Sequence, residues 1–148
     1  MTRLYLDTEF NGFGGALMSV ALVPQDPALA TFYAVVATSE PLNPWVAQHV
    51  VPNLWGEPRS RTLVSADIAG YIRSFDTPVI IADWPTDFEH LLALLITGPG
   101  SMQALPDFQM DFMNLHGFNT ADHSRVPHNA LEDARALRDH CEAMVDDT

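Results

Sequence analysis

The 148-residue sequence contains no lysine, and its seven basic residues are all arginines. Nineteen acidic residues outnumber them, which gives the chain a formal net charge of -12 at pH 7. Broad, nonspecific adhesion to nucleic acid or anionic lipid is therefore unfavourable, because both polyanions repel an acidic surface. An enzyme acting on nucleic acid is not excluded, since bound divalent cations reverse the local charge of a site.

Cysteine is almost absent, and long apolar runs are absent too. Cys141 is the only cysteine, which excludes an intrachain disulfide, a C-x-x-C motif and a zinc site built from several cysteines. Apolar runs such as LLALLI (91–96) are far shorter than the roughly 20 residues of a membrane span. Asp7 and Glu9 also interrupt any signal-peptide h-region near the N-terminus. We therefore expect a cytoplasmic protein without a membrane partner.

The overall composition is that of a globular protein, with 47% hydrophobic and 18% charged residues. A chain of this length is predicted to form one domain over residues 1–148. Apolar or β-branched runs at 3–7, 15–23 and 31–38 are separated by the turn signals NGFGG and PQDPA. This pattern predicts three consecutive antiparallel strands joined by short turns.

The pattern then alternates between helices and strands. Helical spacing covers 43–54, where Asn43 and Pro44 are the expected start, and 65–75, where Ser65 is the expected N-cap. Further strands are predicted at 78–83 and 108–113, and further helices at 86–96 and 129–145, whereas 98–127 is rich in glycine and proline and otherwise looser. The order predicts an α/β fold, a mixed five-stranded sheet flanked by helices. Sites in such sheets form near the C-terminal ends of strands.

Acidic residues occur at three such places. Asp7 and Glu9 share one face of the first strand, because side chains alternate with a period of two. Asp83 and Asp87 surround a strand-to-helix junction, and His128 precedes Asp133 by about a turn and a half at the last helix. Each pair alone has an ordinary explanation, as a solvated strand end, a helix cap (Thr86 or Asp87) or a surface acid. Glu132 is expected on a solvated face, without a role.

The three acidic groups together favour a metal-dependent catalytic site over three separate structural roles. Several converging carboxylates repel one another unless a cation lies between them. Oxygen ligands favour Mg²⁺ or Mn²⁺ over zinc, and two such ions about 3.5–4 Å apart clamp the attacking and leaving oxygens of a phosphodiester. A nearby histidine can take the proton of the attacking water.

Three motifs resemble those of the DEDD exonucleases. LYLDTEF (4–10) resembles the D-x-E motif, TDFEHLL (86–92) the second motif, and HNALEDA (128–134) the H-x4-D motif of the DEDDh branch. The resemblance runs from residue 4 to about 140. The chain looks most like small bacterial stand-alone 3′→5′ exoribonucleases, and it is also similar to oligoribonuclease, RNase T and polymerase proofreading domains.

The resemblance implies an RNase H-like fold and a two-metal mechanism. It implies that Asp7, Glu9, Asp87 and Asp133 hold two divalent cations, Mg²⁺ or Mn²⁺, and that His128 is the general base. The implied activity removes nucleoside 5′-monophosphates from the 3′ end of single-stranded RNA or DNA, with RNA favoured. Related enzymes are often dimers, so a homodimer is among the expected states.

The second motif departs from the family pattern. Many relatives have an asparagine four residues before the aspartate and an aromatic residue just before it, where this chain has Asp83 and Thr86. Asp83 is therefore either a rival or an auxiliary to Asp87, and we favour Asp87 because the helical apolar pattern follows it. Asp83 could also bond a neighbouring backbone group or contact a metal through water, and it is a further candidate for substrate contact.

Substrate contacts have alternatives. Phe10 and Trp84 either stack on a base or belong to the core, and Arg125 either meets a phosphate or is a solvated loop residue. Thr8 is a further candidate for substrate contact, although its side chain is expected to point away from the two neighbouring acids. Two rival functions also remain: a catalytically silent RNase H-like module that binds nucleic acid or protein, and a phosphodiesterase acting on dinucleotides.

Overall fold

The computed structural model describes all 148 residues, and its centre is a five-stranded mixed sheet in the order β3-β2-β1-β4-β7. The antiparallel half consists of β1 (Arg3–Phe10), β2 (Leu17–Pro24) and β3 (Phe32–Val35). β4 (Val79–Ala82) pairs in parallel with β1, and β7 (Gln109–Phe112) pairs in parallel with β4. The predicted α/β fold with three antiparallel strands at the start is confirmed, and the topology is RNase H-like.

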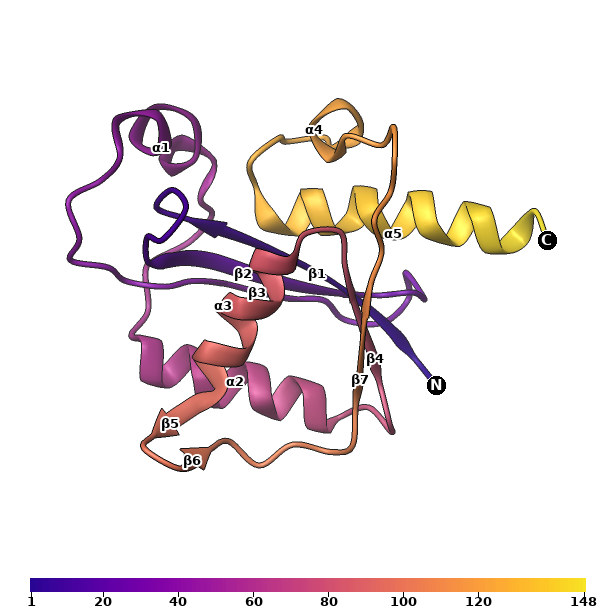
Figure 1. The fold of residues 1–148 in the computed structure, drawn as a ribbon, viewed down its shortest axis with the longest axis horizontal. Helices are drawn as coiled ribbons and strands as arrows, with labels where there is room; N and C mark the ends of the chain where they lie inside the picture. The colour runs from indigo at the N-terminus through magenta and orange to yellow at the C-terminus, as the bar shows by residue number, and fades with distance from the viewer.

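Helices cover both faces of the sheet (Figure 1). α2 (Arg61–Arg73) and α3 (Pro85–Leu95) pack on one face, and α5 (Ala130–Asp146) packs on the other. The alternation of β1 follows from this arrangement. Leu4 and Leu6 enter the core beneath α2 and α3, whereas Tyr5 enters the core beneath α5. Because β2 is buried along its whole length, it reads as a continuous apolar run.

Smaller elements complete the fold. They are α1 (Pro44–His49), a 3₁₀ turn (Val51–Asn53), the hairpin strands β5 (Ile96–Gly98) and β6 (Ser101–Met102), and α4 (Thr120–His123). In Figure 1, α1 and α4 lie on the same side of the sheet as α5. The β5–β6 hairpin and α4 lie within or next to residues 98–127, the segment predicted to be less regular. No helix combines the length and apolar character that spanning a lipid bilayer requires.

The caps of two helices show how the sequence fixes their starts. Asn43 begins α1 as predicted, and its side chain accepts a hydrogen bond from the Trp45 amide at 2.9 Å. The predicted Ser65 cap of α2 is wrong, because Ser60 holds that position and accepts from the Leu63 amide at 3.3 Å. Val64 lies four positions before Ile68 and is buried on the same face of the helix. Its burial stabilises one more turn on the N-terminal side of Ser65, so the helix begins earlier than predicted.

Candidate metal centre

The site forms where the carboxyl ends of β1 and β4 meet. Because the two strands are parallel and Tyr5 pairs with Ile81, the same register carried two residues further brings Asp7 beside Asp83. α3 begins immediately afterwards at Pro85, and its first turn contains Asp87. Parallel pairing thus joins two acidic segments that are almost 80 residues apart in the sequence.

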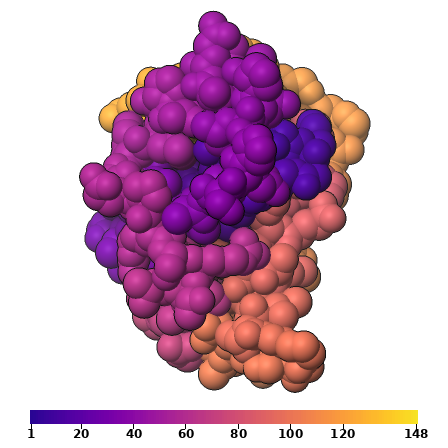
Figure 2. Space-filling view, turned by 90° about the vertical axis from the view of Figure 1, so that its left-hand side faces the viewer, coloured from indigo at the N-terminus to yellow at the C-terminus, as the bar shows by residue number.

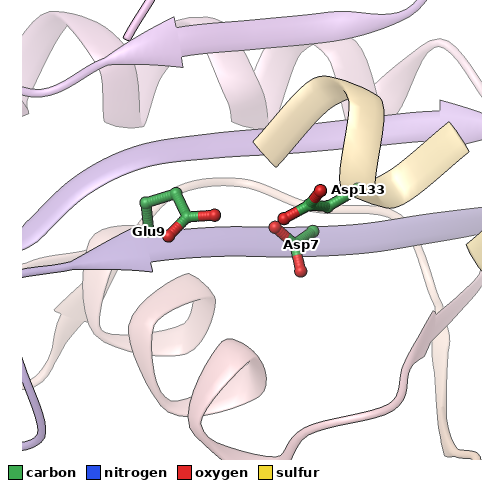
Figure 3. Close-up of side chains that lie close together, drawn as sticks. All are labelled: Asp7, Glu9 and Asp133. Atoms are coloured by element: carbon green, nitrogen blue, oxygen red, sulfur yellow. The ribbon is translucent and has the colours of Figure 1, made fainter. Parts of the chain in front are cut away.

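Two clusters of carboxylates share Asp7. Ligand oxygens of Asp7, Glu9 and Asp133 lie within 4.8 Å of one another, and the same holds for Asp7, Asp83 and Asp87. Figure 3 shows Asp7 and Glu9 on β1 facing Asp133 on α5. The four acids predicted from the motifs therefore lie together, and Asp83 joins them instead of replacing Asp87. Each cluster could hold one metal ion, with Asp7 common to both.

Three buried oxygens in these clusters have no hydrogen-bond partner. They are Oδ2 of Asp7, Oδ2 of Asp87 and Oδ1 of Asp133. Burying an ionised carboxylate without a partner is costly, and natural proteins avoid it. A hard divalent cation takes carboxylate oxygens as ligands and would satisfy these atoms. The donor set therefore fits Mg²⁺ or Mn²⁺.

The raised pKa values of the clustered acids also indicate that the site is stabilised by positive charge. Burial, reinforced by the charge of Asp87, holds the pKa of Asp7 well above its usual value. Burial and the adjacent Asp133 raise the pKa of Glu9 to about 9. Burial raises the pKa of Asp87 to about 7, although hydrogen bonds from Thr8 act in the opposite direction. Without a cation, the cluster retains protons at neutral pH.

Thr8 holds Asp87 in place. Its hydroxyl donates to Asp87 Oδ1 at 2.6 Å, and its amide donates to the same oxygen at 3.2 Å. Thr8 is buried on the α3 side of β1, together with Leu4 and Leu6. One oxygen of Asp87 is thereby fixed while the other, Oδ2, is left without a partner. The sequence placed Thr8 among the substrate contacts, whereas the structure gives it this bond to a carboxylate.

Asp83 has a different partner. Its Oδ2 accepts a hydrogen bond from the Thr120 hydroxyl at 3.2 Å, which ties α4 to the acidic cluster. Burial raises the pKa of Asp83 as well. Asp83 is thus less constrained than Asp87, which has two donors from β1.

A cleft of about 500 Å³ opens beside the carboxylates. It is lined by Asp7, Thr8, Glu9, Asp87 and His128, and by four aromatic residues, Phe10, Phe13, Trp45 and Trp84. Figure 2 shows the β1–β2 turn (indigo) reaching the surface between the α1 segment (purple) and α3 (salmon). The cleft therefore combines acidic groups with apolar rings.

The exposure of the aromatic side chains that line the cleft shows which of them belong to the core. Trp84 is 58% exposed, which excludes the alternative that it belongs to the core. Phe10 is half-buried and stacks on His90 with ring centroids 4.8 Å apart. Sequence reasoning missed Phe13 and Trp45, which are 78% and 51% exposed. A phenylalanine at the tip of the glycine-rich turn NGFGG was a usable signal for Phe13.

His128 adopts a backbone conformation that is rare outside glycine. Its φ is +67°, and the residue that follows, Asn129, caps α5. The Trp45 ring meets the His128 ring edge-on, with centroids 5.1 Å apart. Non-glycine residues in left-handed geometry cluster at functional sites, where the surroundings compensate for the strain. The turn places the histidine in the lining of the cleft, beside the carboxylates.

Arg125 and Glu132 both lie outside the cleft. Arg125 is exposed and lines a separate hollow next to α5, away from the cleft. Glu132, expected on a solvated face, is only 7% exposed, and the Arg135 guanidinium donates to it at 2.6 Å. That expectation is wrong because α4 and the loop after it pack against α5.

No protein-family model matches the chain, and no curated protein matches it. The RNase H-like topology and the acidic cluster therefore stand on the geometry alone.

Proposed function

We propose that the chain is a metal-dependent 3′→5′ exonuclease that acts on single-stranded nucleic acid, RNA in preference to DNA, and releases nucleoside 5′-monophosphates. One observation carries the proposal: two carboxylate clusters share Asp7 and border an aromatic-lined cleft. The polarity and the product follow from the resemblance of the three motifs to the DEDDh exonucleases.

The carboxylates divide the binding of two cations between them. Asp7, Glu9 and Asp133 would hold one ion, and Asp7, Asp83 and Asp87 the other. Bound divalent cations would neutralise the clustered carboxylates and stabilise negative charge on the attacking and leaving oxygens of the phosphodiester.

The remaining residues of the cleft position the substrate and move a proton. His128, at the rim of the acidic cluster, accepts the proton of the attacking water as general base. Phe13, Trp45 and Trp84 offer exposed rings on which bases stack, a contact that tolerates any base because every base has a π-face. Thr8 keeps Asp87 oriented while the substrate binds.

A dinucleotide phosphodiesterase is the second candidate, because the size of the cleft favours it. About 500 Å³ is the volume of a small-molecule site and suits a short nucleotide fragment. A silent binding module is less favoured, since such a module has no need to bury three unpartnered carboxylate oxygens.

Matched 5′-labelled RNA and DNA oligonucleotides, incubated with the purified protein and Mn²⁺ or Mg²⁺, test the proposal. We expect a ladder shortened stepwise from the 3′ end, with RNA degraded faster than DNA. EDTA and the Asp133→Asn variant serve as controls and should leave the substrate intact. Internal cleavage, release of the label as a mononucleotide before any shortened intermediates form, or intact RNA in the presence of Mn²⁺ would contradict the proposed exonuclease. Cleavage of dinucleotides alone would favour the second candidate.

A further inference from the structure

A second hollow, of about 200 Å³, gathers much of the positive charge of this acidic protein. Arg125, Arg135 and Arg138 line it together with His123, so three of the seven arginines of the chain meet there. The hollow lies along α5 and the loop that precedes it. None of its lining residues belongs to the carboxylate clusters or to the cleft beside them.

The charges in the hollow do not cancel. Glu132 pairs with Arg135 at 2.6 Å, and Asp139 pairs with Arg138 at 2.8 Å. Arg125 is exposed and has neither an ion pair nor a hydrogen bond. Three guanidinium groups against two carboxylates leave one positive charge in excess, on a chain whose net charge is -12. This hollow therefore attracts an anion that the rest of the surface repels.

The hollow and the carboxylate cluster lie on two sides of the start of α5. Glu132 lines the hollow, and its neighbour Asp133 belongs to the cluster with Asp7 and Glu9. Arg125 precedes His128, which lines the cleft, by three residues. In Figure 1, α4 lies directly over this part of α5. An anionic polymer whose end occupies the cleft therefore has the hollow within reach.

We propose that the hollow binds an internucleotide phosphate of the nucleic-acid strand, upstream of the 3′ end that enters the cleft. The guanidinium group presents planar donors that match phosphate oxygens, and Arg125 has all of its donors free. Arg135 and Arg138 are held by their carboxylate partners and supply the positive wall of the subsite. The identity of the ligand as a nucleic-acid strand rests on the proposed function.

Binding of single-stranded RNA of two, four and eight nucleotides, measured in EDTA where no cleavage occurs, tests the subsite. Arg125→Glu should weaken binding of the octamer about tenfold, the size expected for a charged hydrogen bond at an exposed position, and leave the dinucleotide unaffected. In Arg125→Ala, the slope of log affinity against log salt should become less steep by about 0.7, the loss of one phosphate contact.

Arg61→Glu is the matched control. Arg61 is also exposed and unpaired, but it begins α2 on the opposite face of the sheet, and its replacement changes the net charge equally. We expect Arg61→Glu to change octamer binding less than twofold. Equal losses in the two variants, or an octamer that wild-type protein does not bind, would overturn the subsite. An effect confined to 5′-phosphorylated oligonucleotides would also overturn it, in favour of a terminal-phosphate site.

A separate Mn²⁺-dependent cleavage assay keeps this inference distinct from the proposed function. Cleavage by wild-type protein with equal octamer binding in both variants would remove the subsite and leave the exonuclease in place. Octamer binding that depends on Arg125, without cleavage of any substrate, would keep the subsite and remove the exonuclease. Thermal melting of each variant verifies that it is folded.

Discussion

At the scale of single residues, the proposed chemistry depends on His128. It lines the cleft in a left-handed backbone conformation, next to the cluster that contains Asp133. His128→Ala should lower kcat about 10²–10⁴-fold, because the attacking water loses its proton acceptor. Affinity for Mn²⁺, measured by calorimetry, should stay close to that of wild-type protein, since no carboxylate is removed. Unchanged turnover would exclude His128 as the base.

Thr8 supports a second prediction at this scale. Thr8→Val keeps the shape of the side chain and removes the hydroxyl that donates to Asp87 at 2.6 Å. Outer-shell partners of this kind typically change metal affinity about 10–100-fold, so Mn²⁺ binding should weaken by about tenfold. Thr8→Ser restores the donor and should recover most of the affinity. Equal Mn²⁺ affinity in Thr8→Val and wild-type protein would show that the bond does not position Asp87.

At the scale of elements, the start of α5 connects the fold to the site. Asn129 is fully buried, its side chain accepts from the Glu132 amide at 3.0 Å, and it donates to the Asn53 carbonyl at 2.8 Å. Asn129→Ala should lower the free energy of unfolding by about 1–3 kcal/mol, because the Glu132 amide and the Asn53 carbonyl each lose a hydrogen-bond partner. Urea denaturation measures the change.

The exposed cap of α4 provides the comparison. Asn119 accepts from the Ala121 amide at 3.1 Å, but it caps only one turn of helix. Asn119→Ala should therefore cost well under about 1 kcal/mol. If both caps cost the same, the partly buried bond to Asn53 contributes nothing to stability.

The sequence was sufficient for the elements that carry strong local signals. Turn residues separated the first three strands, and Asn43 and Asn129 marked helix starts. It was insufficient for α4, a single four-residue turn with three polar residues that is helical because it packs on α5. It also misplaced the cap of α2, because Ser60 and Ser65 are equally plausible until tertiary packing buries Val64.

At the scale of the whole molecule, the buried acids make stability depend on pH and metal. The pKa values of Glu9 and Asp87 are raised to about 9 and about 7, well above the values of unfolded acids. The metal-free fold therefore binds more protons than the unfolded chain between about pH 4 and pH 9, and its stability falls as pH rises through that window.

Thermal melting across this window tests the linkage. In EDTA, Tm should fall from pH 5 to pH 8.5, and added Mg²⁺ should raise Tm more at pH 8.5 than at pH 5, because the cation competes with protons for the same oxygens. Asp7→Asn, which removes the shared acid, should flatten the pH dependence. A Tm in EDTA that rises toward pH 8.5 would contradict the described electrostatics.

The candidate site could be predicted in outline, because motif spacing places Asp7, Glu9 and Asp133 at element ends. The remaining parts of the site follow only from the tertiary structure. Only the parallel pairing of β1 with β4 brings Asp83 beside Asp7, so that Asp83 and Asp87 belong to one carboxylate cluster with it. The bond from Thr8 to Asp87 joins residues 79 positions apart, which no local pattern encodes. The place of Trp45 in the lining of the cleft likewise depends on tertiary packing.

The central claim is that two divalent cations bind the acidic cluster and share Asp7. Calorimetric titration of the metal-free protein with Mn²⁺ tests this most directly. The clusters predict two Mn²⁺ ions per chain in wild-type protein, and Asp7→Asn, which removes a ligand of both ions, should lose both binding events. Absence of Mn²⁺ binding to wild-type protein, or two full sites retained in Asp7→Asn, would contradict the account.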